Sequence, residues 1–271
     1  MNIKAEFPIG VFDSGIGGLT VVHALQQTLP HENIIYFGDT ARVPYGTKSP
    51  QVVREYARDD AEFLIKQNVK MIVIACNTVS AVALDVVQNI SRIPVVGVII
   101  PGAKLAVAST KNKKIGIIGT TGTILSKAYE NAIRQNEKDI LSFGKACPLF
   151  VPLVEEGLIN HKATELLAKE YLFPLIAKKI DTLILGCTHY PLLKNILREV
   201  TNNEINLIDS GEAAAKEVFE VLKKENLLNK SRLKARLQFF VSDSPEKFTA
   251  IGEKFLGTSL GRVKKVSITS H

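Results

Sequence analysis

The sequence predicts an α/β protein made of two pseudo-symmetric units, each with a central, mostly parallel sheet, and three observations support that prediction. Short apolar segments typical of strands alternate with segments of helical periodicity along the 271 residues. The segments that end at Cys76 and Cys187 are almost continuously apolar, as are strands buried on both faces of a parallel sheet. Each of these cysteines is also followed at once by a threonine-containing turn. We therefore expect each cysteine to be the last residue of its strand, where ligands bind in such folds.

The first part of the chain alternates strands and helices. Strands are expected at residues 8–13, 33–39, 69–76 and 94–99. Apolar residues at helical spacing from Leu19 predict a helix that ends before Pro30. A second helix is expected to begin with Ser49 as N-cap and Pro50 at its first position, and to run to about Asn68.

The rest of the chain repeats the pattern with different spacing. Strands are expected at residues 113–120, 181–187, 205–210 and 238–244. The strand that ends at Cys187 is the counterpart of the one that ends at Cys76. Asp209 and Glu212 have the spacing of a capping box, which predicts a helix start after the strand at 205–210.

Composition narrows the class of protein. The chain is 46% hydrophobic and 23% charged, which is ordinary for a soluble globular enzyme. No apolar run is long enough to span a membrane, and the N-terminal residues do not have the form of a signal peptide. Three scattered cysteines do not form a disulfide framework, so we expect a cytoplasmic protein with free thiols. The net charge is +7, but the lysine-rich stretches at 111–114 and 223–236 lack interleaved aromatics, which favours solvated surface over a nucleic-acid groove.

The first predicted strand ends in a glycine-rich turn with the sequence DSGIGG. A dinucleotide fingerprint is disfavoured because Thr20 stands where a third glycine is needed and because Asp13 would repel a pyrophosphate. We expect a tight turn with Asp13 and Ser14 facing a ligand. The alternative is that the glycines serve only close packing of strand and helix.

Two further turns have the composition of ligand-binding loops. The turn at Pro44, Tyr45 and Gly46 is rigid and has backbone amides that could hold a carboxylate, although most turns of this sequence are only turns. Residues 119–123, GTTGT, offer hydroxyls and amides at another strand end. Hydroxyl side chains in such a place more often cap the next helix than bind a ligand.

The paired cysteines are the strongest indication of chemistry. A single buried cysteine is usually a small hydrophobic residue, and we expect that role for Cys147. Two cysteines at equivalent strand ends favour a shared role, in which two thiols act on both faces of one substrate atom. Metal binding by Cys76, Cys187 and His189 lacks the usual ligand spacing. A cysteine hydrolase using Cys187 and His189 would leave Cys76 unexplained.

Six segments in this order resemble the glutamate racemase family: FDSGIGGLTV, GDTARVPYG, ACNTVSA, VPLVEEG, GCTHYPLL and FVSDSPEKF. Together they extend over nearly the whole chain. Aspartate racemases share the two-cysteine plan but usually not the DSGIGG, PYG and SDSPE segments. The resemblance implies two α/β domains with the active site in the cleft between them. Residues 1–98 and 209–271 would form the first domain, and residues 99–208 the second.

The resemblance also implies an activity. The family interconverts L- and D-glutamate without pyridoxal phosphate or metal, and D-glutamate enters peptidoglycan. By the family's pattern, Cys76 would abstract the α-proton of D-glutamate and Cys187 that of L-glutamate. Asp13 and His189 resemble the groups that tune or relay protons for these thiols. Adjacency favours His189 for Cys187 and leaves Asp13 for Cys76.

Substrate-binding positions are carried over from the same motifs. Besides the four catalytic groups, they comprise Ser14, Asn77, Thr78 and Thr188 for the ammonium and α-carboxylate, Pro44, Tyr45 and Gly46 for the side-chain carboxylate, Thr120 and Thr123 as weaker contacts, and Glu155, whose role the resemblance leaves open. The expected partner is a small-molecule substrate, with no nucleic acid and no membrane, in a homodimer or alternatively a monomer. The rival functions are a racemase of another acidic amino acid, a cysteine-dependent hydrolase and a non-catalytic amino-acid-binding protein.

Overall fold

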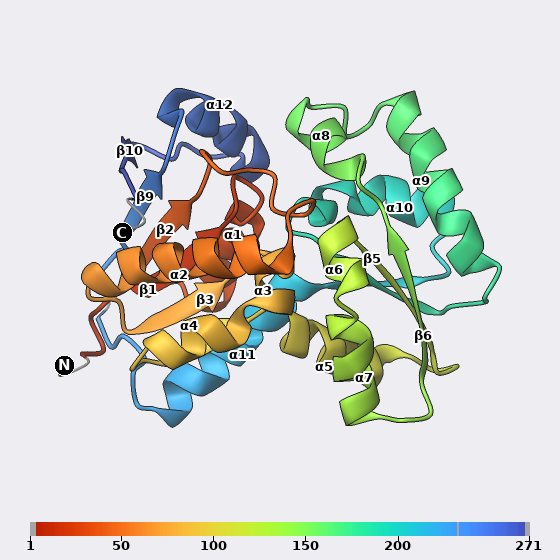
Figure 1. Ribbon diagram of the computed structural model, residues 1–271, viewed down its shortest axis with the longest axis horizontal. Helices are drawn as coiled ribbons and strands as arrows, with labels where there is room; N and C mark the ends of the chain where they lie inside the picture. The colour runs from red at the N-terminus through yellow and green to blue at the C-terminus, as the bar shows by residue number, and fades with distance from the viewer. Residues whose placement is uncertain (1–3, 232, 269–271) are drawn as a thin grey trace.

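The strands of the chain pair into two separate sheets, and every paired strand is parallel to its neighbour. The computed structural model describes residues 4–231 and 233–268. One sheet has six strands in the order β10-β9-β2-β1-β3-β4, and the other has four in the order β6-β5-β7-β8. The two sheets with their helices lie side by side, and both chain ends lie on the six-stranded side (Figure 1). The predicted α/β class is therefore confirmed.

The six-stranded unit is assembled from both ends of the described chain. Its strands are β1 (Ile9–Asp13), β2 (Ile34–Gly38), β3 (Met71–Ile74), β4 (Val95–Gly97), β9 (Leu237–Val241) and β10 (Val263–Lys265). Its helices are α1 (Leu19–Thr28), α2 (Pro50–Lys66), α3 (Asn77–Val82), α4 (Leu84–Ile90), α11 (Ser210–Lys224) and α12 (Pro245–Leu256). Because β9 pairs with β2, the chain returns to this sheet after building the other one.

The four-stranded unit is continuous in sequence. Its strands are β5 (Lys114–Gly119), β6 (Leu141–Ala146), β7 (Thr182–Gly186) and β8 (Asn206–Asp209). Its helices are α5 (Ile99–Ser109), α6 (Thr121–Leu125), α7 (Ala128–Asn136), α8 (Phe150–Glu155), α9 (Lys162–Ile176), η1 (Tyr190–Leu193) and α10 (Lys194–Val200). No helix in the described parts of the chain is both long and apolar enough to cross a membrane.

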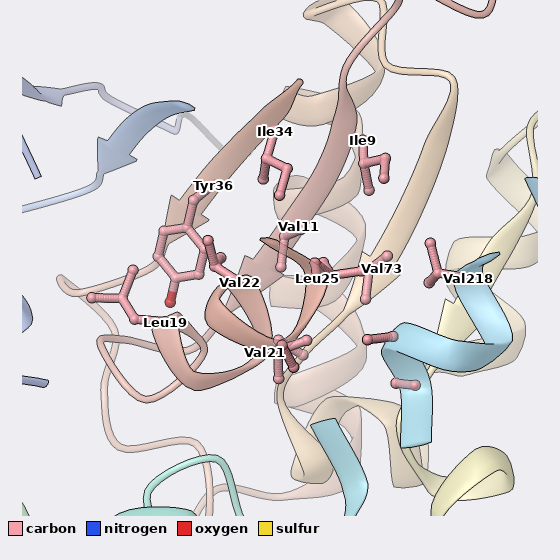
Figure 2. Close-up of a cluster of buried hydrophobic side chains, with 14 of the residues drawn as sticks. Ile9, Val11, Leu19, Val21, Val22, Leu25, Ile34, Tyr36, Val73 and Val218 are labelled. Atoms are coloured by element: carbon pink, nitrogen blue, oxygen red, sulfur yellow. The ribbon is translucent and has the colours of Figure 1, made fainter. Parts of the chain in front are cut away.

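Alternating side chains bury both faces of the six-stranded sheet. Ile9 and Val11 of β1 pack with α1 and α11 on one face, whereas Phe12 packs with α2 on the other. Figure 2 shows the first of these clusters, in which Val22 and Leu25 of α1 lie against the sheet. Burial of this kind on both faces is what holds a parallel sheet together. It leaves the strand ends free to present polar residues.

The second helix begins as predicted, while other local features differ from the prediction. Ser49 accepts a hydrogen bond from Val52 N–H, with Pro50 at the first helical position. At the start of α11, Asp209 caps the N–H groups of Gly211 and Glu212. The Glu212 carboxylate bonds Lys194, so the expected reciprocal capping box is only half formed.

The two cysteines lie just beyond their strands and not at the last strand position. Strand β3 ends at Ile74, and Cys76 is the N-cap of α3. Strand β7 ends at Gly186, immediately before Cys187. The chain must leave the sheet before either thiol can point along the sheet edge, because side chains within a strand point to the faces.

Candidate active site

One cavity of about 380 Å³ lies at the carboxyl ends of both sheets. Its lining comes from segments that follow β1, β2, β3, β5, β6 and β7. The lining residues are Ser14, Gly15, Val43, Pro44, Tyr45, Gly46, Thr47, Cys76, Asn77, Thr78, Thr120, Thr121, Pro148, Val151, Pro152, Glu155, Cys187, Thr188 and His189. Both predicted thiols therefore face the same cavity, one from each sheet. Its size is within the range of small-molecule sites.

Cys76 lies among hydroxyl and carboxyl groups. Its Sγ is 3.7 Å from Ser14 Oγ. Burial, followed by the nearby charge of Asp13, raises the pKa of the Cys76 thiol to about 12. This thiol is therefore protonated at neutral pH.

Cys187 has a different neighbour. Its Sγ lies 3.9 Å from His189 Nδ1, and His189 Nε2 is 2.9 Å from Glu155 Oε1. Burial opposes protonation of the imidazole, but the hydrogen bonds with Cys187 and Glu155 raise the pKa of His189 to about 10. Burial also opposes ionisation of Glu155, yet contact with His189 lowers the pKa of that carboxyl. His189 thus connects Cys187 to the Glu155 carboxylate on this side of the cavity.

Asp13 lies behind the cavity and does not line it, contrary to the expectation that it faces the ligand. Its Oδ2 accepts hydrogen bonds from the N–H groups of Gly15 and Gly18, at 3.1 and 3.0 Å. Its Oδ1 is buried without a hydrogen-bond partner in the described structure. Burial raises the pKa of Asp13, an effect that the His189 charge opposes. Although Asp13 does not line the cavity, its charge raises the pKa of the Cys76 thiol.

Asn77 lines the cavity, and the two ends of its amide differ in their hydrogen bonding. Its Oδ1 is 2.6 Å from the Tyr129 hydroxyl and 3.4 Å from Ser210 Oγ, which both donate to it. Its Nδ2 is buried and has no partner in the part of the chain that the structure describes. Neither Tyr129 nor Ser210 was predicted from the sequence, because no local motif links residues so far apart in the chain.

Three threonine hydroxyls meet beside Asn77. Thr78 Oγ1 lies 2.9 Å from Thr120 Oγ1 and 3.4 Å from Thr123 Oγ1. Thr120 caps α6 by accepting from Thr123 N–H, and it also lines the cavity. Thr123 is only 1% exposed and does not line the cavity, so it supports the other two hydroxyls and is not itself a contact.

The turn at residues 43–47 forms one wall of the cavity. Because the Tyr45 ring is buried, Tyr45 can meet a ligand only through its main chain, and Gly46 has no side chain. Neither residue's N–H donates a hydrogen bond to any described residue. These amides match the predicted carboxylate-binding turn in position.

The glycine-rich turn brings the two units close together. A Cβ on Gly17 would lie 2.2 Å from Thr188 Oγ1 and 2.5 Å from His189 Nδ1, so only glycine fits there. Thr20 Oγ1 donates to the Thr188 carbonyl at 2.9 Å. The turn therefore does more than pack a helix on its strand, because it also forms a contact between the units beside His189.

Several lining residues were not predicted. Thr47 follows the predicted turn, Thr121 follows Thr120, and Val151 and Pro152 belong to the VPLVEEG segment, so each adjoins a signal that the sequence carries. Cys147 is buried and does not line the cavity, and its Sγ lies 3.6 Å from the Lys145 carbonyl oxygen. No group of three or more His, Cys, Asp or Glu side chains within 4–231 and 233–268 is placed to hold a metal ion.

Comparison with known proteins gives one consistent family. The family model for Asp/Glu/Hydantoin racemase matches residues 11–218. A glutamate racemase from Chlorobaculum tepidum is 55% identical over 268 residues, which is 98% of each chain. The crystal structure of glutamate racemase from Francisella tularensis in complex with D-glutamate is 44% identical, with a TM-score of 0.92 over 98% of this chain and 100% of that one. A Bacillus anthracis glutamate racemase isoform is 39% identical, with a TM-score of 0.94 over 97% and 98% of the two chains.

Proposed function

The chain belongs to the Asp/Glu/Hydantoin racemase family, and on that premise we propose the reaction and the mechanism of its cavity. It is a glutamate racemase, an isomerase that interconverts L- and D-glutamate. The observation that carries the assignment is the pair of thiols, Cys76 and Cys187, which reach one small cavity from two sheets. An amino acid bound between them has a proton donor and a proton acceptor on opposite faces of its α-carbon.

Inversion proceeds by two proton transfers. With L-glutamate bound, the Cys187 thiolate takes the α-proton, and the electron pair remains on the substrate as a carbanion delocalised into the α-carboxylate. The Cys76 thiol then donates its proton to the opposite face. The product is D-glutamate, and the enzyme is left with a Cys187 thiol and a Cys76 thiolate. The reverse reaction exchanges the two roles, as microscopic reversibility requires.

Two neighbours assist the thiols. His189, held by Glu155, places positive charge beside Cys187 and so stabilises the thiolate. Asp13 lies close enough to Cys76 to favour its protonated form. We therefore assign Asp13, His189 and Glu155 to tuning these protons rather than to direct attack on the substrate.

Substrate recognition uses the free donors of the cavity. We assign binding of the α-carboxylate, and of the negative charge that develops on it, to Asn77 Nδ2 and the Thr78, Thr120 and Thr188 hydroxyls. These residues line the cavity, and Asn77 Nδ2 has no partner among the described residues, which supports the assignment. Donors fixed before the reaction need no reorganisation, which lowers the barrier. The amides of Tyr45 and Gly46 take the side-chain carboxylate, and Ser14 Oγ accepts from the ammonium group.

Four further assignments accompany this mechanism. We divide the chain into domains 1–98 with 209–271, and 99–208. Residues 1–3, 232 and 269–271 lie outside the described structure. Sheet membership supports the division. The reaction needs neither pyridoxal phosphate nor metal, because the thiols supply both base and acid. It takes place in the cytoplasm, where thiols stay reduced, and supplies D-glutamate for peptidoglycan. We propose a homodimer, which light scattering of the purified protein will test.

Circular dichroism of the purified protein tests the function directly. D-Glutamate should lose its signal as it racemises, while D-aspartate should change far more slowly. In deuterated water, the product enantiomer should carry solvent deuterium at Cα from the first turnover. Equal turnover of aspartate would support the rival substrate. Product that kept its original α-hydrogen would exclude the two-thiol mechanism. Activity should survive both dialysis against a chelator and treatment with hydroxylamine.

A further inference from the structure

A buried group of charges lies behind the turn at residues 43–47. The Arg42 guanidinium pairs with three carboxylates, at 2.5 Å from Asp39, 2.7 Å from Asp59 and 2.9 Å from Asp60. The side chains of Asp39 and Asp60 are 1% and 0% exposed. These four residues, the Arg42 cluster, do not line the cavity. The proposed mechanism leaves them without a role.

Burial of this many charged groups behind a turn is energetically unfavourable. Three carboxyl groups share one guanidinium. The desolvation free energy of such buried charges can exceed the favourable energy of the ion pairs that they form. Burial, with Asp39 nearby, raises the pKa of Asp60 well above its ordinary range. Apolar residues of similar size would hold a surface turn as well. Such an unfavourable arrangement indicates that the exact position of the adjoining turn at residues 43–47 is important for function.

Tyr45 connects the cluster to the cavity. Its hydroxyl donates to Asp39 Oδ2 and lies 3.2 Å from Asp60 Oδ2. The Arg42 guanidinium also stacks 4.1 Å above the Tyr56 ring, which packs against Tyr45. The Tyr45 side chain is thus anchored in the six-stranded unit, and its main chain is held at the cavity wall.

The SDSPE segment supports the same cluster. Ser242 Oγ donates to Asp39 Oδ1 at 2.8 Å and accepts from Ala41 N–H at 2.8 Å. Asp243 N–H donates to Thr40 Oγ1 at 2.8 Å. The turn that follows β2 is therefore held from β9 as well, which gives a motif outside the cavity a physical connection to it.

The other side of the turn meets the four-stranded unit. Gly122 N–H donates to the Gly46 carbonyl at 2.9 Å. A Cβ on Gly46 would lie 2.7 Å from Thr120 Cβ, so only glycine lets the turn approach Thr120 this closely. The amides of Tyr45 and Gly46 are consequently fixed between the Arg42 cluster and α6.

We propose that Arg42, acting through Asp39, Asp60 and Tyr45, is a positioning residue that determines selectivity for a substrate with a side-chain carboxylate. The cluster holds the Tyr45 and Gly46 amides at a fixed distance from the thiols. It thereby selects a side chain that ends in an anion at that distance. The cluster has this role only if the cavity binds glutamate, so the inference rests on the proposed function.

Two variants test the role, with a matched control. Tyr45→Phe removes only the hydroxyl that joins the turn to the cluster, and Arg42→Met removes the central cation. Arg54→Met is the control, because Arg54 also pairs with a carboxylate, Asp85, but is far more exposed and does not line the cavity. For each protein we would measure kcat and KM for D-glutamate, and Ki for D-norvaline, a five-carbon amino acid without the side-chain carboxylate.

A change in KM for D-glutamate without a change in Ki for D-norvaline distinguishes a role in positioning the amides from a general loosening of the cavity. Because a lost hydrogen bond to a charged group corresponds to roughly tenfold in binding, Tyr45→Phe should raise KM about tenfold, with Arg42→Met raising it further. The norvaline Ki should stay within about twofold of wild type, and Arg54→Met should change neither constant. If KM and the norvaline Ki rise together, or if Tyr45→Phe leaves KM unchanged, the proposal is wrong.

Failure of the function itself would look different. Wild-type protein that leaves D-glutamate unchanged would overturn the racemase assignment, and the positioning role with it. If wild-type protein racemises glutamate and Tyr45→Phe has the same KM, only the positioning role is overturned. Thermal melting shows whether Arg42→Met is folded. If it is not, Tyr45→Phe decides the outcome.

Discussion

The two thiol sites of the cavity are matched in topology and unlike in chemistry. Each thiol follows a central strand of its own sheet, one residue after β7 and two after β3. Cys76 lies beside a hydroxyl and a buried carboxyl group, whereas Cys187 lies beside an imidazole that is held by Glu155. The shared topology places the two thiols, and their neighbours give them different electrostatic surroundings. Burial and Asp13 raise the pKa of Cys76, whereas the raised pKa of His189 puts positive charge on the Cys187 side.

This asymmetry cannot favour one direction of the reaction at equilibrium. L- and D-glutamate are enantiomers of equal free energy, so kcat/KM must be the same in both directions for any variant. Differences between the two sites can appear only in kcat and KM separately, in isotope effects and in pH dependence. The experiments that probe the comparison must therefore measure those quantities.

Removing either thiol should have the largest effect. Cys76→Ala and Cys187→Ala should each lower racemisation by about 10⁴-fold or more in both directions, because either direction uses both groups. Circular dichroism with each enantiomer measures this. Cys147→Ala is the control and should keep most activity, since Cys147 does not line the cavity. If one of the two thiols proved dispensable, the sites would not be a pair, and a single-nucleophile enzyme would have to be reconsidered.

Replacing the imidazole should weaken one site selectively. His189→Asn should lower kcat/KM about 10²-fold in both directions, because proton transfer at Cys187 loses its supporting charge. With α-deuterated substrates, the isotope effect should rise for L-glutamate, whose abstraction by Cys187 becomes limiting, and fall for D-glutamate. The exposed His23→Asn variant should behave as wild type. Isotope effects that changed equally in both directions would contradict the assignment of His189 to one thiol.

The residues that follow the two cysteines allow a finer comparison. Tyr129→Phe frees the Asn77 amide from its hydrogen bond, so kcat/KM should fall about threefold to tenfold. Tyr190→Phe is a matched control, because it removes a buried hydroxyl whose one hydrogen bond among the described residues is to the Cys147 carbonyl, at 2.8 Å. Both variants should lose similar stability in thermal melts. A kinetic loss in Tyr190→Phe as large as that in Tyr129→Phe would show that orientation of Asn77 is not the cause.

The smallest expected effect is on stability at alkaline pH. His189 has a pKa of about 10 in the folded chain against 6.5 ordinarily, so its contribution is fully present below about pH 6.5 and is lost as pH rises through about 10. Cys76, with its raised pKa, adds a loss above about pH 9 that wild type and variant share. Between pH 6.5 and 10, wild type should therefore lose more melting temperature than His189→Asn, by several degrees. Parallel melting curves would show that His189 is not protonated in the folded protein.

The sequence predicted every strand of the two sheets except β6 and β10, which both lie at sheet edges. Strands β3 and β7 are buried on both faces, so their apolar runs are unmistakable. The edge strand β6 has no fully buried residue, and β10 is three residues of mostly exposed chain, so neither has a periodic apolar signal. The return of the chain to its first sheet was expected only from the resemblance to a family, because strand pairing between distant segments has no local signature.

The candidate site shows the same limit. Cys76, Cys187 and His189 could be identified because strand ends and adjacent residues are visible in sequence. Asp13 was correctly placed near the site but wrongly expected to face the cavity, since the depth of a side chain depends on packing. Tyr129 reaches Asn77 from another helix, and such contacts are visible only in three dimensions.

The interrupted sheet has a consequence for synthesis of the chain. Strands β5 to β8 lie in one continuous stretch, so the four-stranded sheet can form as soon as residue 209 has emerged from the ribosome. Strand β2 must wait for β9, at residues 237–241, to cover its open edge, and an unpaired edge of this kind invites pairing with other chains. A nascent chain stalled between these points would therefore carry a complete four-stranded sheet beside an unpaired edge of β2.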